Sequence, residues 1–375
     1  MRILLVNAQG ADLAAGGSGR YVADLARGLG ERGHDVHVLA GFPAIEDGAP
    51  STTVLHDRHW RESRMRRWRN HLADLWARPS GPLRRALAGS RPELVHTSNL
   101  PGFSTAVWET ARQAGLPVVH TLHDYHLLCP RSSLTRRDGT PCCPHESFCA
   151  FRTRRLARWA PIVSDVIAGS DHLAAKERRL FPNARFEVVR LPLVPVAERE
   201  LRPPQAPPRS IGYLGGLDPV KGVRELLEAA PALVELGLRV RLAGGGRLRQ
   251  EVEAAFSVEY LGPVFGAEKI GFIEETDVAV VPSTWEEPNG PNYVVAEWVA
   301  AGRPVLCSTR GGLAEAQRLP GVTGIEPTVE GIAEGARQLA GSGSAARLSA
   351  ITDRADMERW LDQHEAVYER ASTSA

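Results

Sequence analysis

A repeated alternation of short apolar segments with segments of helical periodicity is the feature that most constrains the fold. Residues 3–7 (ILLVN) form a continuous apolar run, which is typical of a parallel strand buried on both faces. A glycine-rich turn follows at 16–19, and apolar residues then recur at helical spacing as far as Gly33. Further strand-like runs of the first half lie at 35–40, 92–99, 116–124, 163–170 and 186–193. Repeated β-α-β units of this kind predict a doubly wound α/β sheet.

The same alternation begins again after a proline-rich segment. Residues 198–210 carry four prolines and no hydrophobic periodicity, which is typical of a linker. Further strand-like runs lie at 211–217, 239–246, 258–264, 276–283 and 304–309, with helical segments at 223–237, near 291–301 and at 354–370. We therefore expect two Rossmann-like domains facing a central cleft, because open α/β sheets bind ligands outside the carboxyl ends of their strands. The expected divisions are a first domain at 1–197, a linker at 198–209, a second domain at 210–354 and a C-terminal segment at 355–375.

Length and composition exclude several classes of protein. A chain of 375 residues with 43% apolar and 24% charged residues is typical of a globular protein with two domains. The formal net charge of +1 provides no global basic field for nucleic acid. No apolar run approaches the ~20 residues that a membrane span needs, and the first residues lack the apolar core of a secretory signal. We therefore expect a cytoplasmic protein.

An arginine- and tryptophan-rich run at 58–85 allows two interpretations. Trp60, Trp68, Leu72 and Trp76 recur near helical spacing. They fit a surface helix whose apolar stripe packs into the core. They also fit an acceptor-binding patch or a weak contact with a membrane surface.

Two strand–turn–helix connections offer sites for an anion. The turn at Gly16 and Gly17 precedes a helix, whose free N–H groups and positive dipole end favour negative charge. This turn lacks the G-x-G-x-x-G spacing, and no acidic residue ends the second strand, which disfavours a dinucleotide. Lys221, one of only three lysines in the chain, lies in the second connection and could neutralise a diphosphate. A plain tight turn and a solvated lysine are the alternatives.

Residues 280–315 hold the densest group of polar side chains. The loop after the strand at 276–283 presents Glu286, Glu287, Asn289, Gly290, Pro291 and Asn292. Glu297 follows on a predicted helix with apolar neighbours, so a fully exposed position is disfavoured. A carboxylate on the first turns of such a helix suits the binding of sugar or ribose hydroxyls, and a solvated helix face is the alternative.

Taken in order, these segments resemble the retaining glycosyltransferases of family 4, which have the GT-B fold. The matching stretches are GGSGRYVADLARGLGERGHDV, HTLHD, GYLGGLDPVKGV, AGGG and PSTWEEP…VVAEWVAAGRPV, so the resemblance covers nearly the whole chain. The chain is also similar to the member of the family from the avilamycin-type orthosomycin antibiotic pathway. The resemblance implies a C-terminal helix that crosses back onto the first domain.

The resemblance further implies roles for individual residues. Gly16 and Gly17 would lie against the donor diphosphate, and Lys221 would bind it. His123, in HTLHD, matches the histidine near the reacting sugar, and Glu297 matches the carboxylate that binds the nucleotide ribose. The remaining donor-binding residues would be Asn289, Gly290, Pro291 and Asn292.

Two positions depart from the family pattern. Gly216 stands where the family usually has an arginine, so either Lys221 and backbone amides suffice or another arginine substitutes, with Arg190, Arg247 and Arg310 as candidates. The family's paired glutamates are usually separated by seven residues, and that spacing places Asn289 before Glu297. We favour Glu287 as the catalytic carboxylate on the donor sugar, after a two-residue insertion, and keep Asn289 as the alternative.

The implied reaction moves a sugar from a nucleotide-diphosphate sugar (UDP, GDP or dTDP) to an acceptor hydroxyl with retention of configuration. The acceptor would be a natural-product oligosaccharide or another glycoconjugate. Lys221, helix N-termini and backbone amides would stabilise the leaving diphosphate, so we expect no catalytic metal or cofactor. A non-catalytic nucleotide-sugar-binding protein and a sugar-nucleotide epimerase of the same fold are the alternatives.

Residues 120–151 hold four of the five cysteines and four histidines. His123 ends a predicted strand, whereas the remainder reads as a long loop beside the acceptor. Four tetrahedral ligands of a structural zinc could come from Cys129, Cys142 or Cys143, His145 and Cys149. A disulfide clip and reduced thiols packed in the loop are the other two interpretations.

Overall fold

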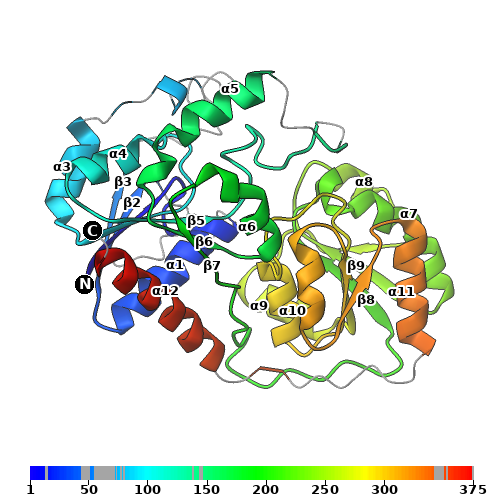
Figure 1. Ribbon diagram of the computed structural model, residues 1–375. Coiled ribbons are helices and arrows are strands. Elements are labelled where there is room, and N and C mark those ends of the chain that lie inside the picture. The colour runs from blue at the N-terminus through cyan, green and yellow to red at the C-terminus, as the bar shows by residue number, and fades with distance from the viewer. Residues whose placement is uncertain are drawn as a thin grey trace. The chain divides into compact units, whose positions relative to one another are not determined.

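The chain forms two compact units (Figure 1). The computed structural model describes residues 1–12, 16–43, 51–54, 72, 74–76, 78, 81–136, 139–142, 147–341, 350–351 and 354–373. The first unit comprises Met1–Leu134, Cys143–Val189 and Arg359–Ala375, and the second comprises Thr135–Cys142 and Arg190–Glu358. None of the described helices is both long and apolar enough to cross a membrane.

The first unit is built on a seven-stranded parallel sheet in the order β3-β2-β1-β4-β5-β6-β7. The strands are β1 (Arg2–Asn7), β2 (Asp35–Ala40), β3 (Thr52–Val54), β4 (Leu94–Thr97), β5 (Val118–Leu122), β6 (Asp165–Ala168) and β7 (Arg185–Val188). The helices are α1 (Gly17–Glu31), α3 (Gly81–Ser90), α4 (Ala106–Gln113), α5 (Ser147–Leu156), α6 (Asp171–Glu177) and α12 (Ala355–Thr373), with 3₁₀ turns η2 (Ala157–Ile162) and η3 (Arg178–Leu180). Strands β4, β5 and β6 are buried at every position, as their continuous apolar sequences predict.

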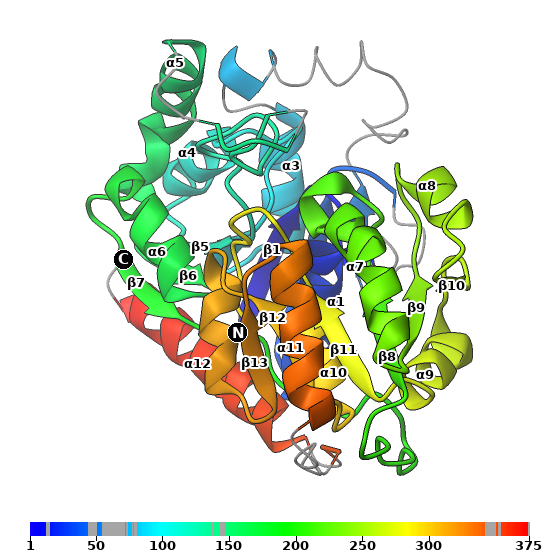
Figure 2. The ribbon, with the colours of Figure 1, turned by 90° about the vertical axis from the view of Figure 1, so that its right-hand side faces the viewer.

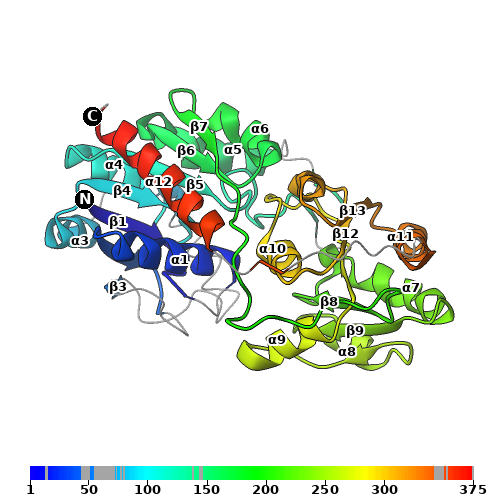
Figure 3. The ribbon, with the colours of Figure 1, turned by 90° about the horizontal axis from the view of Figure 1, so that it is seen from below.

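The C-terminal helix α12 packs against α1, as Figure 3 shows. A Cβ atom on Gly28 would lie 2.7 Å from Leu361 Cδ1, so the two helices approach closely at this glycine. Arg32 pairs with Asp362 at 2.8 Å, and His34 Nε2 lies 2.8 Å from Glu365 Oε1. The predicted return of the C-terminal helix to the first unit is therefore confirmed.

The second unit is built on a six-stranded parallel sheet in the order β10-β9-β8-β11-β12-β13. The strands are β8 (Ser210–Leu214), β9 (Arg239–Ala243), β10 (Glu259–Tyr260), β11 (Val278–Val281), β12 (Val305–Ser308) and β13 (Val322–Ile325). The helices are α7 (Val223–Glu235), α8 (Arg249–Glu253), α9 (Gly266–Glu274), α10 (Tyr293–Ala300) and α11 (Val329–Gly341), with 3₁₀ turns η4 (Pro219–Lys221) and η5 (Gly312–Arg318).

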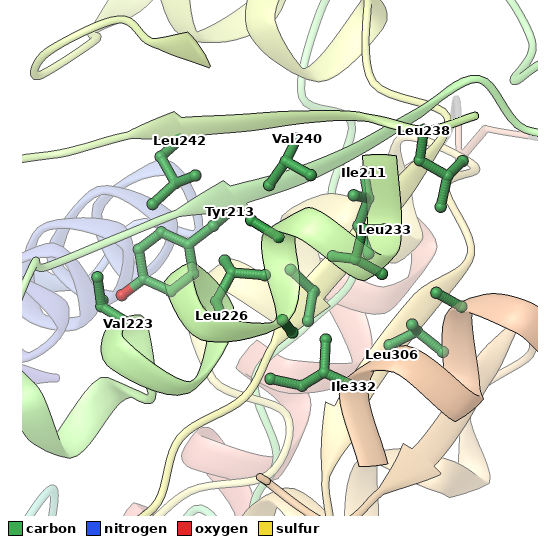
Figure 4. Packing of buried hydrophobic residues seen from close by; sticks show 14 of the residues in the cluster. Ile211, Tyr213, Val223, Leu226, Leu233, Leu238, Val240, Leu242, Leu306 and Ile332 are labelled. Carbon is green, nitrogen blue, oxygen red and sulfur yellow. The ribbon is translucent and has the colours of Figure 1, made fainter. Parts of the chain in front are cut away.

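The core of the second unit explains why α7 forms where the sequence predicts it. Apolar residues recur along α7 at helical spacing, and Leu226 and Leu233 are fully buried. They pack with Ile211, Tyr213 and other side chains of the sheet (Figure 4). Figure 2 shows α11 running beside α7, and both helices contribute to this apolar cluster.

The proline-rich segment at 198–209 lies along the second unit. The backbone N–H groups of Gln205 and Arg209 donate to Asp277 at 2.8 and 2.9 Å, and Leu201 is buried in the apolar cluster around α10. The neighbouring prolines have no N–H group to donate, so Gln205 and Arg209 supply the N–H groups that hold this segment to Asp277.

Candidate active site

The glycine-rich turn of the first unit begins α1, as predicted. Gly16 is the N-cap of α1 with φ 105°, a conformation that favours glycine. A Cβ atom on Gly19 would lie 2.3 Å from the carbonyl oxygen of Asp12, so this turn also needs glycine there. Ser18 donates to Gln9 Oε1 at 2.8 Å and accepts from Asn99 Nδ2 at 3.1 Å. These bonds tie the start of α1 to the carboxyl ends of β1 and β4.

His123 directly follows β5 in the same unit. Its ring packs edge-on against Tyr21 of α1, with ring centroids 4.6 Å apart and an interplanar angle of 75°. Burial, with a smaller contribution from His364, lowers the pKa of His123 to about 3. The imidazole is therefore neutral near neutral pH. A neutral imidazole offers one N–H donor and one acceptor, which suits the orientation of sugar hydroxyls.

Three polar side chains of the second unit meet at the carboxyl ends of β8 and β11. Lys221 Nζ donates to Glu287 Oε1 at 2.6 Å, and the Ser283 hydroxyl donates to the same oxygen at 2.8 Å. The Glu287 side chain is 6% exposed and that of Lys221 is 32% exposed, so the pair is open to solvent on the lysine side. Lys221 also lies 5.2 Å from the centre of the Trp285 ring.

Backbone contacts fix both partners of this ion pair. Gly222 has φ 72°, and a Cβ atom there would lie 1.9 Å from the carbonyl oxygen of Pro282. The N–H of Thr284 donates to the carbonyl of Val220 at 3.0 Å. The N–H of Gly312 donates to the Glu287 carbonyl at 2.7 Å. The turn before α7 and the loop after β11 therefore form one fixed structure.

Glu297 forms a second ion pair in the same unit. Asn292 caps α10 by accepting from the N–H of Val295 at 3.0 Å, and Glu297 lies 7% exposed on that helix. Lys269 of α9 donates from Nζ to Glu297 Oε1 at 2.7 Å. Lys269 and Ser283 are not among the site residues that the sequence predicts. The scarcity of lysine is the signal that could have identified Lys269, since both lysines of this unit pair with predicted site carboxylates.

The position of the missing family arginine is open to a side chain. A Cβ atom on Gly216 would meet only Asp218 Oδ2 within 4 Å, at 3.8 Å. Arg247 donates from Nε to Asp218 Oδ1 at 2.5 Å, beside this turn. Arg190 pairs with Glu315 at 2.7 Å, and Arg310 lies 3.8 Å from Glu326.

The remaining predicted residues of the loop, 289–291, lie close to the turn η5. A Cβ atom on Gly290 would lie 1.7 Å from the carbonyl oxygen of Gly312, so a larger residue does not fit there. Pro291 is buried, and Asn289 is half-buried. Of the predicted site residues, Glu287 is in contact with Lys221, and Glu297 is in contact with Lys269.

The cysteine-rich segment is described in part. Cys129 is buried, Cys142 and Cys149 are half-buried, and Cys143 and His145 lie outside the described residues. Within the described ranges, no three His, Cys, Asp or Glu side chains are grouped to hold a metal ion. The zinc site remains a prediction.

The arginine- and tryptophan-rich run is also described in part. Trp60 and Trp68 lie outside the described residues. Leu72 is 40% exposed and Trp76 is 58% exposed, so neither packs into the core as the surface-helix interpretation expects. The predicted contact with a membrane surface or acceptor stays a prediction.

Comparison with known proteins identifies the class of enzyme. The family model described as Glycosyltransferase Family 4 matches residues 15–195, and that described as Glycosyl transferases group 1 matches residues 208–342. The glycogen synthase of Mycobacterium tuberculosis is 26% identical over 388 aligned residues, which cover 94% of this chain and 89% of the relative.

Solved structures show the same fold. Sucrose-phosphate synthase from Thermosynechococcus elongatus superposes with a TM-score of 0.72 at 19% identity, covering 100% of this chain and 99% of that chain. The HepE protein of Anabaena, in complex with UDP, gives a TM-score of 0.67 at 16% identity, covering 99% of this chain and 100% of that chain.

A glycosyltransferase of avilamycin A biosynthesis is also similar in structure. Its TM-score is 0.52 at 19% identity, covering 100% of this chain and 99% of that chain, which shows a shared fold alone. The predicted GT-B architecture of two Rossmann-like units is confirmed. With its N-terminal part matching the family 4 model and its C-terminal part matching the group 1 model, the chain is a glycosyltransferase of the GT-B fold.

Proposed function

We propose that the chain is a retaining glycosyltransferase that moves a sugar from a nucleotide-diphosphate sugar to an acceptor hydroxyl. The observation that carries the proposal is the contact of Lys221 and Ser283 with the buried carboxylate of Glu287. This group lies at the carboxyl ends of β8 and β11, where open α/β sheets bind ligands. It offers a cation for a diphosphate and an acceptor for sugar hydroxyls.

The chemistry follows from the charge that develops on the leaving group. Departure of the diphosphate concentrates negative charge on its oxygens, and the partly exposed Lys221 ammonium can stabilise it. We propose that Lys221 then exchanges its contact with Glu287 for the diphosphate. Glu287 would accept hydrogen bonds from the donor sugar, and the neutral His123 would orient a sugar hydroxyl. Gly16 and Gly17 would lie against the diphosphate.

The donor is proposed to be a UDP, GDP or dTDP sugar, with its ribose held by Glu297. UDP in the structure of the Anabaena relative supports a nucleotide donor. Asn289, Gly290, Pro291 and Asn292 would shape the same site. The proposal includes catalysis without a metal, because Lys221 and helix N-termini supply positive charge. It also includes a natural-product or other glycoconjugate acceptor, with antibiotic biosynthesis as the candidate pathway.

The direct test is incubation with a panel of nucleotide sugars and acceptors, read by mass spectrometry. Lys221→Ala and Glu297→Ala should each lower turnover by about 100-fold or more, the scale of losing a preorganised electrostatic contact. Circular dichroism checks that both variants remain folded. Full transfer by both folded variants would show that the donor site is assigned wrongly.

A non-catalytic nucleotide-sugar-binding protein is the second candidate. Gly216 favours it, because a residue without a charge stands where the family usually has an arginine. Calorimetry with UDP, GDP and dTDP, followed by a donor hydrolysis assay, separates the two functions. Binding without any hydrolysis or transfer would favour the second candidate, and release of the free sugar or a transferred product would exclude it.

A further inference from the structure

A chain of buried polar side chains links the C-terminal helix to the histidine that follows β5. Its members are Tyr21 of α1, His96 of β4, Thr121 of β5, and His364 and Tyr368 of α12, all in the first unit. Figure 3 shows α1 and α12 lying side by side. Buried polar groups need partners, so their hydrogen bonds can be counted.

Four contacts connect these side chains, and a fifth joins His364 to a backbone carbonyl. The Tyr368 hydroxyl lies 2.7 Å from His96 Nδ1, and His96 Nε2 lies 2.7 Å from Thr121 Oγ1. Thr121 Oγ1 lies 3.3 Å from the Tyr21 hydroxyl, which lies 2.5 Å from His364 Nε2. His364 Nδ1 lies 2.7 Å from the carbonyl oxygen of Trp360. Burial lowers the pKa of both histidines and raises the pKa of both tyrosines, so all are neutral near neutral pH.

Hydrogen-bond chemistry fixes the direction at the His364 end. A carbonyl oxygen only accepts, so His364 Nδ1 carries the proton and donates to Trp360. A neutral imidazole has one N–H group, so His364 Nε2 is an acceptor. The Tyr21 hydroxyl therefore donates to His364.

The other end of the chain gives the same direction. In the described part of the protein, the Tyr368 hydroxyl meets only His96, so it must donate to Nδ1 to avoid a buried unpaired O–H. His96 Nε2–H then donates to Thr121, and Thr121 donates to Tyr21. One continuous chain of donors thus runs from Tyr368 to the Trp360 carbonyl.

The position of the Tyr21 ring follows from this chain. Its only proton is used by His364, and its ring is packed edge-on between His123 and Trp360. The centroid distances are 4.6 Å to His123 and 5.1 Å to Trp360, with interplanar angles of 75° and 87°. Edge-to-face packing of this kind orients one ring against the other.

We infer that Tyr21 is a positioning residue for His123, and that His364 of α12 holds the Tyr21 ring in the orientation that packs against the imidazole. The inference rests on the role proposed above for His123. The C-terminal helix thereby acts on the sugar-binding histidine as well as completing the first unit.

The experiment compares substitutions of the hydrogen-bonded side chains with one substitution outside this hydrogen-bonded series. His364→Leu removes both hydrogen bonds of the imidazole at similar volume, and Tyr21→Phe removes the hydroxyl but keeps the ring. His364→Gln retains one acceptor and one donor. Arg32→Ala is the matched control. Arg32 caps the C-terminus of α1, and the variant loses its contacts with Asp362 and Glu365 of α12 but keeps the series of buried hydrogen bonds.

The kinetic readout is the division between kcat and the donor KM. His364→Leu and Tyr21→Phe should lower kcat about 10-fold and change KM less than about 2-fold, because a small displacement of a positioned group mainly affects the transition state. His364→Gln should recover kcat to within about 3-fold of the wild-type value. Arg32→Ala should lower the melting temperature without changing kcat. An equal loss of kcat in Arg32→Ala, or no loss in His364→Leu, would overturn the inference.

A second readout separates this inference from the proposed function. The Hε1 proton of His123 should have a ring-current shift from Tyr21, measurable by NMR without any substrate. His364→Leu should move that resonance, and Arg32→Ala should not. If the wild-type protein transfers no sugar, the proposed function fails, and an unmoved resonance in His364→Leu would still overturn the positioning role.

Discussion

At the scale of single residues, the proposed donor site follows the family pattern except at a few positions. Gly216 stands where the family usually has an arginine. Arg247 donates to Asp218, which lies in the same turn as Gly216. The Arg247 side chain is 67% exposed, so a diphosphate can compete with Asp218 for the guanidinium. Among the three arginines considered, it is therefore the best placed substitute.

Exchanging the charge between these two positions tests that assignment. Arg247→Ala should weaken the binding of a nucleoside diphosphate about 10-fold, because one charge-assisted hydrogen bond is lost. Adding Gly216→Arg to this variant should restore most of the affinity, since the position has room for a side chain. Isothermal calorimetry measures both, with Arg310→Ala as a control that should bind normally. Unchanged binding by Arg247→Ala would leave Lys221 and the backbone amides as the sufficient contacts.

Lys269 gives a second prediction at this scale. Its ammonium donates to the Glu297 carboxylate at 2.7 Å. Lys269→Met should weaken nucleotide binding about 10-fold, because the buried Glu297 carboxylate loses the cation that holds it in place for the ribose. Lys269→Arg should keep most of the affinity. The idea fails if Lys269→Met and the wild-type protein bind a nucleoside diphosphate equally well at pH 7.

At the scale of elements, the turn before α7 holds Lys221 at the loop after β11. Gly222→Ala should cost more than about 2 kcal/mol of stability, because its Cβ would overlap the Pro282 carbonyl and its φ is 72°. Gly237→Ala is the matched control, since it has φ 82° but nothing within 4 Å of its Cβ. It should cost about 1 kcal/mol from backbone strain alone. Chemical denaturation compares the two, and equal costs would show that the contact with Pro282 is unimportant.

The elements also show which parts of the fold could be predicted from sequence. Continuous apolar runs identified β1, β5 and β11, because both faces of these strands are buried. The run at 258–264 yields only the two-residue edge strand β10, and Leu261 beside it is exposed. Strand β13 was missed because only one of its four residues is fully buried. These two edge strands lack the two-sided burial that produces a clear pattern.

Residues of the candidate site could be predicted only where the neighbouring sequence marks the end of a strand. Lys221 and Glu287 were found because a turn and a polar loop mark strand ends, and the structure places them in contact. Tyr21 and His364 were missed because they are 343 positions apart in the sequence. A contact between residues so far apart in the sequence depends on where α12 packs, and local sequence patterns do not indicate that.

At the scale of the whole molecule, buried titratable groups couple folding to pH. Burial lowers the pKa of His120 and His123 to about 3 and that of His364 to about 4, and holds that of His96 well below its usual value. The unfolded chain binds protons at these four histidines below about pH 6.5, whereas the folded chain does not. Their contribution to stability is therefore present above pH 6.5 and lost as the pH falls.

Two buried carboxyl groups oppose this effect. Burial raises the pKa of Asp74 to about 7 and that of Glu177 well above its usual value. Between about pH 5 and 6.5 these groups are protonated in the folded state and largely ionised in the unfolded state, so each favours the folded state at lower pH. Near pH 5, four histidines against two carboxyls leave a net uptake of about two protons by these groups on unfolding, and the uptake falls towards pH 6.5, where the unfolded histidines are only half protonated.

These six groups should therefore make the unfolding free energy rise with pH by roughly 2–3 kcal/mol per pH unit near pH 5, and by less towards pH 6.5. His364→Gln removes one of the four histidines and should reduce the slope near pH 5 by about 1.4 kcal/mol per pH unit, whatever its effect on stability at pH 7. His34→Gln is the matched control, because His34 is paired with Glu365 near the surface of the same helix contact. Urea unfolding at several values between pH 5 and 6.5 measures the slopes. If the wild type and His364→Gln have the same slope, His364 is not the neutral acceptor on which the direction of the buried chain depends.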